Sequence, residues 1–313
     1  MGEFLDLSTE GLMTYAFSLS KMEIIRRFIN MGRDENVLVF EDTAKLCKEN
    51  EVLAEAIRTS NSEQKLILEA DSVPDADKNK YESSAKIVIS KKRSYEAAKE
   101  YKDMRVAVHN FASASNPGGG VVRGSSAQEE CLCRCSTLYF DLDVKELWDG
   151  FYNPHRAAAD PIHNDDLIYT PDVVVFKTDT ANPKLIPENE WYKVDVITCA
   201  APNLKANPTN YFNPGDGNKQ VVVKDNELLA IHEKRLRRIL EVAVNNGAEV
   251  VVLGAFGCGA FKNKPEVVAQ AAKNVIKDYL HAFKVIEYAV YCNPRDDWNY
   301  KVFERVLAPY YKK

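Results

Sequence analysis

The chain has 313 residues, of which 45% are hydrophobic and 28% are charged. This is the composition of a globular protein that is long enough to bury a large core. The 41 basic and 46 acidic residues leave a formal net charge of −5, which argues against a protein that coats DNA or RNA. A site for a small anionic ligand remains compatible with that charge, because backbone amides bind phosphate without a net positive charge.

The sequence gives no sign of a membrane span or of export. No stretch reaches the roughly 18 consecutive apolar residues that a span needs, and the N-terminus lacks the charged-then-apolar layout of a secretory signal. Asp6 stands where a myristoylation motif has Ser or Thr. The seven cysteines are an odd number, so we expect reduced thiols and a cytoplasmic protein.

The first 84 residues differ in pattern from the rest. Residues 22–30 and 43–58 carry apolar side chains at helical spacing among many charges. A polar stretch over residues 71–84, which contains Pro74, then interrupts this pattern. We therefore predict an N-terminal helical extension over residues 1–84 and a second, larger domain over residues 85–313.

From residue 85 onward, short strands alternate with amphipathic helices. Runs rich in β-branched residues predict strands over residues 87–89, 104–108, 173–176, 194–198, 250–253 and 285–291. Helical spacing predicts helices over residues 93–101 and 227–246, and another that begins at Pro265; Gly247 ends the second of these. The alternation predicts an α/β fold with a mixed central sheet and helices on both faces. Ligands of such sheets bind beyond the carboxyl ends of strands.

The first glycine-rich loop follows the predicted strand at residues 104–108. It contains, in chain order, Asn110, Asn116, Gly118, Gly119 and Gly120. Consecutive glycines allow a ligand to approach the backbone, although a mobile turn has the same composition. After a spacer of residues 121–127 the helix-start sequence Gln128-Glu129-Glu130 follows. Adjacent carboxylates there suit the binding of a sugar hydroxyl and proton transfer, but they also interact favourably with a helix dipole alone.

The second glycine-rich loop lies between the strand at residues 250–253 and the helix from Pro265. It contains Gly254, Gly257, Cys258, Gly259, Ala260 and Phe261. The loop has neither the lysine of a P-loop nor the glycine spacing of a dinucleotide-binding fold. Its amides and the following helix start are able to bind a diphosphate. A close turn between a strand and a helix explains the glycines equally well.

Together these segments resemble the microbial-type poly(ADP-ribose) glycohydrolases, a family with a macrodomain. The resemblance is carried by the three glycines, the seven-residue spacer and Gln128-Glu129-Glu130, with residues 110–114 and 136–139 on either side. Residues 169–176, 200–203 and 254–261 follow in the order of the family. The resemblance extends from roughly Arg105 to the end of the chain, and the glycine and Gln-Glu-Glu element is its most specific part.

The resemblance implies a macrodomain-like three-layer fold and a glycosidase that cleaves the ribose–ribose O-glycosidic bonds of poly(ADP-ribose). It implies that Glu130 is the catalytic glutamate and that Glu129 binds the terminal ribose. The implied ADP-ribose site comprises Asn110, Asn116, Gly118, Gly119, Gly120, Gln128, Gly257, Cys258, Gly259, Ala260 and Phe261. Poly(ADP-ribose) or ADP-ribosylated proteins are the expected partners and ADP-ribose the product. No cofactor, membrane or direct nucleic-acid partner is expected.

Two alternatives remain open from the sequence. A non-catalytic module that binds ADP-ribose needs both glycine loops, but it does not need the carboxylates of Glu129 and Glu130. A hydrolase of mono-ADP-ribosyl groups, or of a small ADP-ribose derivative, needs the same residues as the polymer hydrolase. Animal members of the family contact adenine through a tyrosine on an extra loop, and no segment here aligns with that loop.

Other reactive side chains do not suggest a metal site. Cys131, Cys133 and Cys135 are two residues apart, whereas zinc sites use Cys-x-x-Cys pairs. His232-Glu233 lacks a second histidine four residues on, and Cys258 has no adjacent base. We expect buried thiols and no metal.

Overall fold

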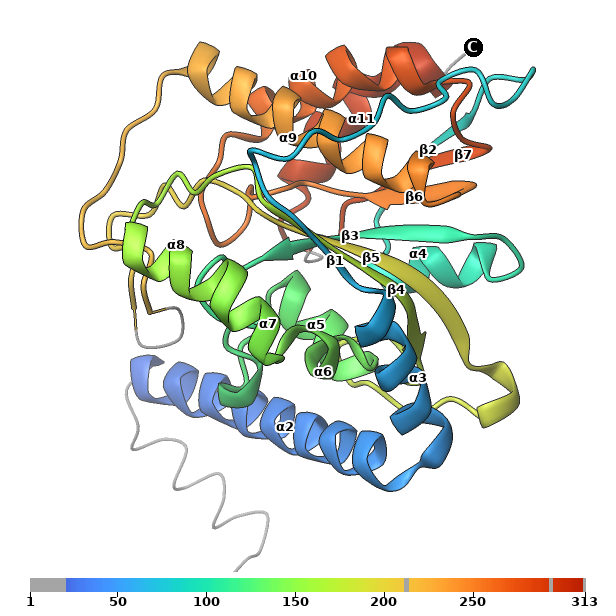
Figure 1. Cartoon of the computed structure of the whole chain (residues 1–313). Helices are drawn as coiled ribbons and strands as arrows, with labels where there is room; N and C mark the ends of the chain where they lie inside the picture. The colour runs from blue at the N-terminus through green and yellow to red at the C-terminus, as the bar shows by residue number, and fades with distance from the viewer. Residues whose placement is uncertain (1–20, 211–213, 293–294, 312–313) are drawn as a thin grey trace, which may run out of the picture.

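The centre of the protein is a mixed sheet of seven strands in the order β1-β4-β5-β3-β6-β7-β2 (Figure 1). The computed structural model describes residues 21–210, 214–292 and 295–311. The strands are β1 (Lys65–Ile67), β2 (Lys86–Ser90), β3 (Val106–Ala112), β4 (Leu167–Val175), β5 (Tyr192–Ala200), β6 (Val250–Leu253) and β7 (Val285–Ala289). Strands β5, β3, β6, β7 and β2 run parallel to one another, while β4 is antiparallel to β5 and β1.

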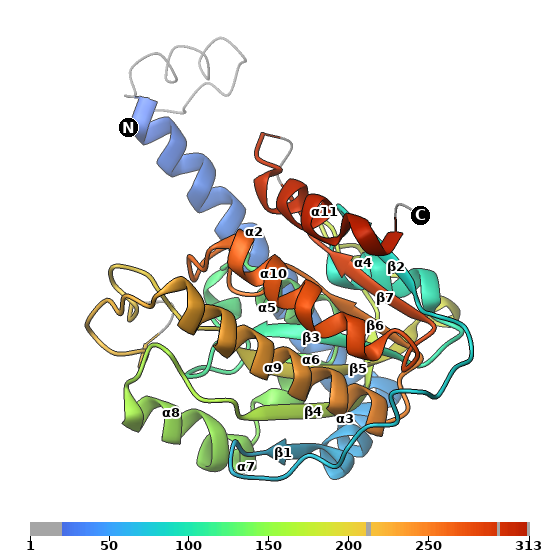
Figure 2. The same ribbon diagram turned by 90° about the horizontal axis from the view of Figure 1, so that it is seen from above.

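Helices cover both faces of this sheet (Figures 1 and 2). One face is covered by α9 (Asp225–Asn245), α10 (Pro265–Ile276) and α11 (Trp298–Tyr311). The other face carries α2 (Lys21–Glu49), α3 (Glu51–Glu63), α4 (Ser94–Ala98), α5 (Gln128–Cys135), α6 (Leu138–Leu142), α7 (Lys145–Leu147) and α8 (Asn153–Ala158). Because both faces are covered, β6 has the fully buried sequence Val-Val-Val-Leu. The predicted three-layer α/β fold is confirmed.

Several strands are longer than the sequence pattern predicts. The strand expected at residues 104–108 continues to Ala112, and the one expected at 194–198 spans Tyr192–Ala200. Asn110 of β3 donates from Nδ2 to Thr198 Oγ1 of β5 over 3.2 Å, so polar residues that look like loop residues pair inside the sheet. The first half of β4 was missed because Pro171 and Asp172 form an irregularity in its pairing with β5.

The helical pattern expected over residues 43–58 is divided in the structure. The chain leaves α2 at Asn50, whose Oδ1 accepts hydrogen bonds from the amides of Val52 and Leu53 at 2.9 and 3.1 Å. These bonds satisfy two amides that the first turn of a helix leaves without a partner. Asn50 is therefore the N-cap of α3, and the sequence forms two helices here.

The described part of the N-terminal segment packs directly on the sheet. Strand β1 pairs antiparallel with β4 and forms one edge of the sheet, while Leu53 of α3 packs with Phe176 just beyond β4. A coil segment then crosses to β2 at the opposite edge (Figure 2). In the part of the chain that the structure describes, no helix is both long and apolar enough to cross a membrane.

We predict that Asn50→Ala lowers the free energy of unfolding by about 1 kcal/mol, because two amides of α3 lose their cap. Urea unfolding followed by circular dichroism measures this change. Asn50→Asp keeps a capping oxygen and serves as the control with near-parental stability. Equal unfolding midpoints for Asn50→Ala and the parent would show that the cap does not stabilise α3.

Candidate active site

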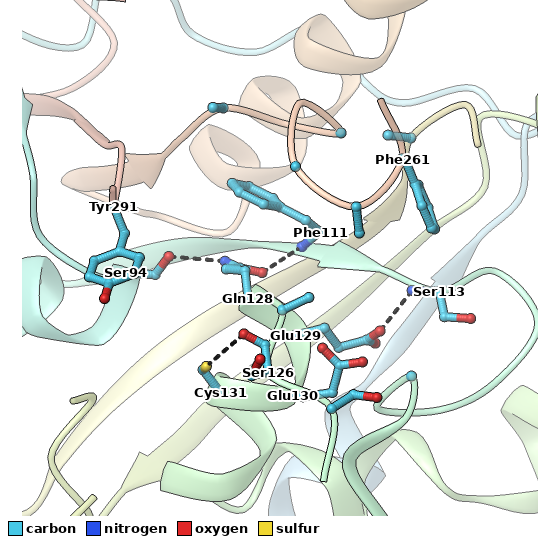
Figure 3. Close-up of a pocket in the computed structure, with 18 of the residues that line it drawn as sticks. Ser94, Phe111, Ser113, Ser126, Gln128, Glu129, Glu130, Cys131, Phe261 and Tyr291 are labelled. Atoms are coloured by element: carbon cyan, nitrogen blue, oxygen red, sulfur yellow. Dashed lines mark hydrogen bonds between the residues drawn. The ribbon is translucent and has the colours of Figure 1, made fainter. Parts of the chain in front are cut away.

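The carboxyl ends of β3, β6 and β7 border a cavity of about 530 Å³ (Figure 3). A volume of this size is typical of a small-molecule site. The strands run parallel, so the loops that follow them meet at one edge of the sheet. Nine of the residues expected in the site line this cavity, namely Gly119, Gly120, Gln128, Glu129, Glu130, Gly257, Gly259, Ala260 and Phe261.

Glu129 is buried at the first turn of α5, with 3% of its surface exposed. Its Oε2 accepts a hydrogen bond from the amide of Ser113 over 2.7 Å, and its Oε1 accepts one from Asn110 Nδ2 over 3.3 Å. Burial raises the pKa of this carboxyl well above its usual value, and the neighbouring Glu130 raises it further. Both oxygens of Glu129 thus already accept from N–H groups, which favour the ionised form.

Glu130 is also buried but has different partners. The Gly120 amide donates to its Oε1 over 2.9 Å, while its Oε2 has no hydrogen-bond partner among the residues that the structure describes. Burial raises the pKa of Glu130, against the opposing effect of the Gly120 hydrogen bond. A buried carboxyl oxygen without a partner is costly unless it is protonated or meets a ligand.

The loop before α5 fits around these carboxyls only because position 119 is glycine. A Cβ at Gly119 would lie 2.6 Å from Glu130 Oε1 and 3.2 Å from Glu129 Oε2, and the residue has a positive φ of +57°. Any side chain there would displace the carboxylates. The glycine therefore permits the close contact between the loop and the two glutamates.

Gln128 fixes the start of α5 to its neighbours. Its Oε1 accepts from the Phe111 amide over 2.9 Å, and its Nε2 donates to the His109 carbonyl and to Ser94 Oγ over 2.8 and 3.0 Å (Figure 3). The side-chain amide thus joins α5 to β3 and α4. Gln128 lines the cavity, as expected, but its polar atoms are used within the protein.

The loop after β6 is held by a residue that the sequence analysis did not single out. Asn263 Nδ2 donates to the carbonyls of Pro202 and Gly257 over 2.6 and 3.2 Å, and Asn263 Oδ1 contacts His232 Nε2 at 2.8 Å. A Cβ at Gly257 would lie 2.6 Å from Asn263 Nδ2, whereas one at Gly259 would meet no atom within 4 Å. Gly257 is therefore needed for packing, and Gly259 leaves the backbone open to the cavity.

Four expected site residues are not among those that line the cavity. Asn110 lies behind Glu129 and binds it, as described above. Asn116 donates from Nδ2 to the Gly119 carbonyl, and its Oδ1 accepts from Arg156 Nη2 over 3.2 Å. A Cβ at Gly118 would meet the ring of Tyr139 at 2.8 Å, and Cys258 packs against the core behind the loop. Sequence proximity to a glycine loop does not distinguish a lining residue from a supporting one.

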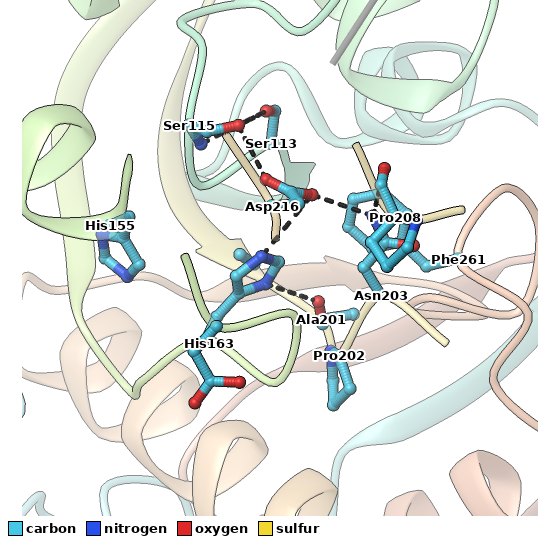
Figure 4. Close-up of polar contacts among 12 residues, drawn as sticks. Ser113, Ser115, His155, His163, Ala201, Pro202, Asn203, Pro208, Asp216 and Phe261 are labelled. Atoms are coloured by element: carbon cyan, nitrogen blue, oxygen red, sulfur yellow. Dashed lines mark hydrogen bonds and ion pairs between the residues drawn. The ribbon is translucent and has the colours of Figure 1, made fainter. Parts of the chain in front are cut away.

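A buried acid joins two walls of the site (Figure 4). Asp216 accepts hydrogen bonds from Ser115 Oγ over 2.7 Å and from Asn203 Nδ2 over 2.9 Å, and it lies 3.6 Å from His163 Nε2. Burial would raise the pKa of Asp216, but its contacts with His163, Ser115 and Asn203 hold that pKa below its usual value. The cluster connects the loop after β3 to the segment after β5.

Several lining residues come from segments that carry no motif. Arg33 of α2 lines the cavity, as do Arg93, Asp179 and Tyr291. The Arg93 guanidinium lies 4.1 Å from the centroid of the Tyr291 ring. These residues are distant in the sequence and only the fold brings them together, so no local pattern could have identified them.

The three closely spaced cysteines of α5 are buried, and burial raises the pKa of each thiol. Across the described ranges, no three His, Cys, Asp or Glu side chains are arranged as ligands of a metal ion. Cys131 instead accepts hydrogen bonds to Sγ from Arg93 and Arg134, over 3.1 and 3.3 Å.

The sequence matches the family model of the microbial-type PARG catalytic domain over residues 21–178, which is just over half of the chain. The chain belongs to this family. PARG stands for poly(ADP-ribose) glycohydrolase, so the family and the glycosidase class predicted from the sequence are confirmed.

Solved structures of this family resemble the chain over most of its length. The PARG of Thermomonospora curvata is 26% identical with a TM-score of 0.72, over 87% of this chain and 98% of that one. The PARG of Deinococcus radiodurans, solved in complex with ADP-ribose, is 29% identical with a TM-score of 0.68, over 82% of this chain and 98% of that one. No curated protein matches the sequence.

We predict that Gly119→Ala slows catalysis far more than it destabilises the fold. The positive φ costs an alanine about 1–2 kcal/mol, and the new Cβ displaces the Glu130 carboxyl that it would meet at 2.6 Å. Release of ADP-ribose from its polymer, together with the melting temperature, measures both effects. The control is Gly32→Ala in α2, where a Cβ meets nothing within 4 Å. Parental turnover by Gly119→Ala would disprove the steric requirement.

Proposed function

We propose that this protein hydrolyses the ribose–ribose O-glycosidic bonds of poly(ADP-ribose), releases ADP-ribose, and uses Glu130 as the proton donor. The observation that carries the proposal is the buried Oε2 of Glu130, which has no hydrogen-bond partner among the described residues although the residue lines the cavity. This oxygen is available to a ligand, while the other three carboxylate oxygens of the pair accept from N–H groups.

The hydrogen bonds of the pair support a proton on Glu130. Two adjacent buried carboxyls resist simultaneous ionisation, because burial and their mutual repulsion both disfavour the second charge. The donors Ser113 and Asn110 stabilise Glu129 as a carboxylate. On these hydrogen bonds we assign the shared proton to Glu130 Oε2, the oxygen without a partner among the described residues, although burial and the neighbouring Glu130 raise the pKa of Glu129 further. Glu130 Oε2 then donates to the leaving oxygen, and Glu129 accepts a hydrogen bond from a ribose hydroxyl.

In the reaction, Glu130 transfers this proton to the oxygen that leaves C1″ of the terminal ribose. The C1″–O bond breaks, its electron pair goes to the protonated leaving oxygen, and an oxocarbenium-like ribose remains. The Glu130 carboxylate, stabilised by the Gly120 amide, then removes a proton from water as the water oxygen bonds to C1″. One residue thus acts as acid and then as base, unlike glycosidases that use two separated carboxylates.

The walls of the cavity suit the remainder of ADP-ribose. The open backbone at Gly259 and the amides before α10 suit a diphosphate, and the Phe261 ring suits packing against the terminal ribose. The Deinococcus radiodurans enzyme was solved with ADP-ribose and the Thermomonospora curvata enzyme with the inhibitor ADP-HPD, which supports the same ligand for this chain.

Two further proposals concern the division of the chain at residue 84 and the cellular compartment of the protein. The support for the division is that every lining residue except Arg33 follows residue 84. The extension then supports the site from behind. Its Asn36 Nδ2 donates over 3.0 Å to the carbonyl of Gly124, which lies in the spacer before α5. All seven cysteines are free thiols, which supports the cytoplasm as the compartment.

We predict that Glu130→Gln lowers turnover of poly(ADP-ribose) by about a hundred- to ten-thousandfold, the usual contribution of general acid–base catalysis. The glutamine has the same size, so ADP-ribose should still bind in calorimetry and the melting temperature should stay near that of the parent. Glu129→Gln should instead weaken both binding and turnover, because it alters the contact with ribose.

The matched control is Glu146→Gln, which changes an exposed glutamate outside the cavity and should keep the parental rate. If Glu130→Gln releases ADP-ribose as fast as the parent does, the catalytic assignment is wrong. If the parent binds ADP-ribose but releases none from the polymer, the protein is a binding module.

The raised pKa of Glu130 predicts a specific pH dependence of stability. A carboxyl whose pKa is raised by folding holds a proton that the unfolded chain has lost, so its contribution declines as pH rises from the unfolded towards the folded pKa. As pH rises above the usual pKa of a glutamate, the parent should therefore lose more unfolding free energy than Glu130→Gln. Urea unfolding at several pH values measures the difference, and parallel curves would contradict the raised pKa.

A further inference from the structure

A lysine lies at the Phe261 end of the cavity. Lys205 lines the cavity, and its Nζ lies 5.3 Å from the centroid of the Phe261 ring. The two residues are held together through the backbone, because the amide of Leu204 donates to the Phe261 carbonyl over 2.9 Å. The Asp216 cluster anchors the same segment through Asn203. Lys205 is therefore a positioned cation in the wall of the site.

No carboxylate pairs with this lysine among the residues that the structure describes. Lys205 is half-buried, and burial lowers its pKa against the opposing effects of Asp216 and Glu130, while the nearby Lys262 lowers it further. Lys262 is exposed and also has no ion pair in the described ranges. Lys264 differs, because its Nζ lies 2.6 Å from Asp225 Oδ1. Two neighbouring cations without an ion pair among the described residues suit an anion.

The position of these cations relative to the catalytic carboxyl restricts which anion they meet. Phe261 and Tyr291 lie at opposite ends of the cavity, with Glu129 and Glu130 below it on the side of Phe261 (Figure 3). Glu130 is close enough to Lys205 to affect the pKa of the lysine. Lys205, at 5.3 Å from the Phe261 ring, therefore lies at the end of the cavity where the proposed function puts the scissile bond.

The chemistry of the polymer places an anion in the same position. The scissile bond joins C1″ of the unit in the cavity to O2′ of the next unit, and the ribose that carries O2′ has a pyrophosphate on its C5′. We propose that Lys205, assisted by Lys262, binds the pyrophosphate of this next unit, outside the ADP-ribose pocket. The inference rests on the proposed function and makes poly(ADP-ribose) the preferred substrate class, because a mono-ADP-ribosyl group on a side chain has no pyrophosphate beyond the scissile bond.

The test compares Lys205→Gln, Lys205→Arg and Lys262→Gln with the parent. Loss of one charge-assisted contact predicts a fall in kcat/KM on poly(ADP-ribose) of about tenfold for Lys205→Gln, with a weaker dependence of the rate on salt concentration. Lys262→Gln should show a smaller fall in the same direction, and Lys205→Arg should restore most of the rate. The affinity of Lys205→Gln for free ADP-ribose, measured by calorimetry, should stay within about twofold of the parental value because ADP-ribose has no second pyrophosphate.

The matched control is Lys264→Gln, which removes the same charge from a lysine already paired with Asp225 and should leave the rate on the polymer unchanged. The inference is overturned if Lys205→Gln and Lys262→Gln both cleave the polymer at the parental rate, and in that case the proposed function stands. It is also overturned if Lys205→Gln weakens ADP-ribose binding as much as it slows cleavage, because the lysine then serves the unit in the cavity. A parent that releases no ADP-ribose refutes the proposed function and this inference together.

Discussion

The site depends on the burial of two adjacent carboxyl groups. Consecutive residues of a helix point about 100° apart, so Glu129 and Glu130 can share one cavity only if a second segment encloses both. The loop after β3 does this, because its amides at Ser113 and Gly120 each donate to one carboxyl. The backbone of Gly119 lies between these two contacts, at a distance that excludes a Cβ. The glycine at position 119 and the conformation of the loop are therefore required by the same two contacts.

The surrounding contacts hold the loop after β3 and helix α5 in place. Gln128 joins the helix start to β3, and Asn263 holds the second loop against the segment after β5. Two buried histidines behind the second loop stay neutral, because burial lowers the pKa of His109 to about 3 and that of His232 to about 4. They therefore fill space behind the loop without adding charge, and His232 Nε2 contacts Asn263 Oδ1 at 2.8 Å. Buried hydrogen bonds of this kind and the Asp216 cluster together hold the walls of the pocket.

The sequence predicted the layers of the fold and the two loops because those features are local. The glycine triplet and the Gln-Glu-Glu sequence lie within one short segment, and the hydrophobic runs of the central strands need no partner to be seen. The sequence could not show which side chains point into the cavity and which point away from it. Asn110 and Gly119 are close in the sequence. Asn110, however, pairs with β5 inside the sheet, and its side chain therefore contacts Glu129 from the side away from the cavity. Arg33 and Tyr291 come from opposite ends of the chain and both line the cavity. No local sequence pattern predicts that they lie in the same site.

A protein with a formal net charge of −5 that binds a polyanion needs local sources of positive potential. Long-range repulsion is limited because the Debye length at physiological salt is only about 8 Å. Within that range the groups near the substrate decide the interaction, and backbone amides supply partial positive charge without adding basic residues. Lysines such as Lys205, which has no ion pair among the described residues, then bind the pyrophosphate of the next polymer unit at the edge of the pocket. An acidic composition and a polyanionic substrate are thus compatible, because backbone dipoles and a few basic side chains around the cavity, among them Arg33, Arg93 and Lys205, are able to attract an anion locally.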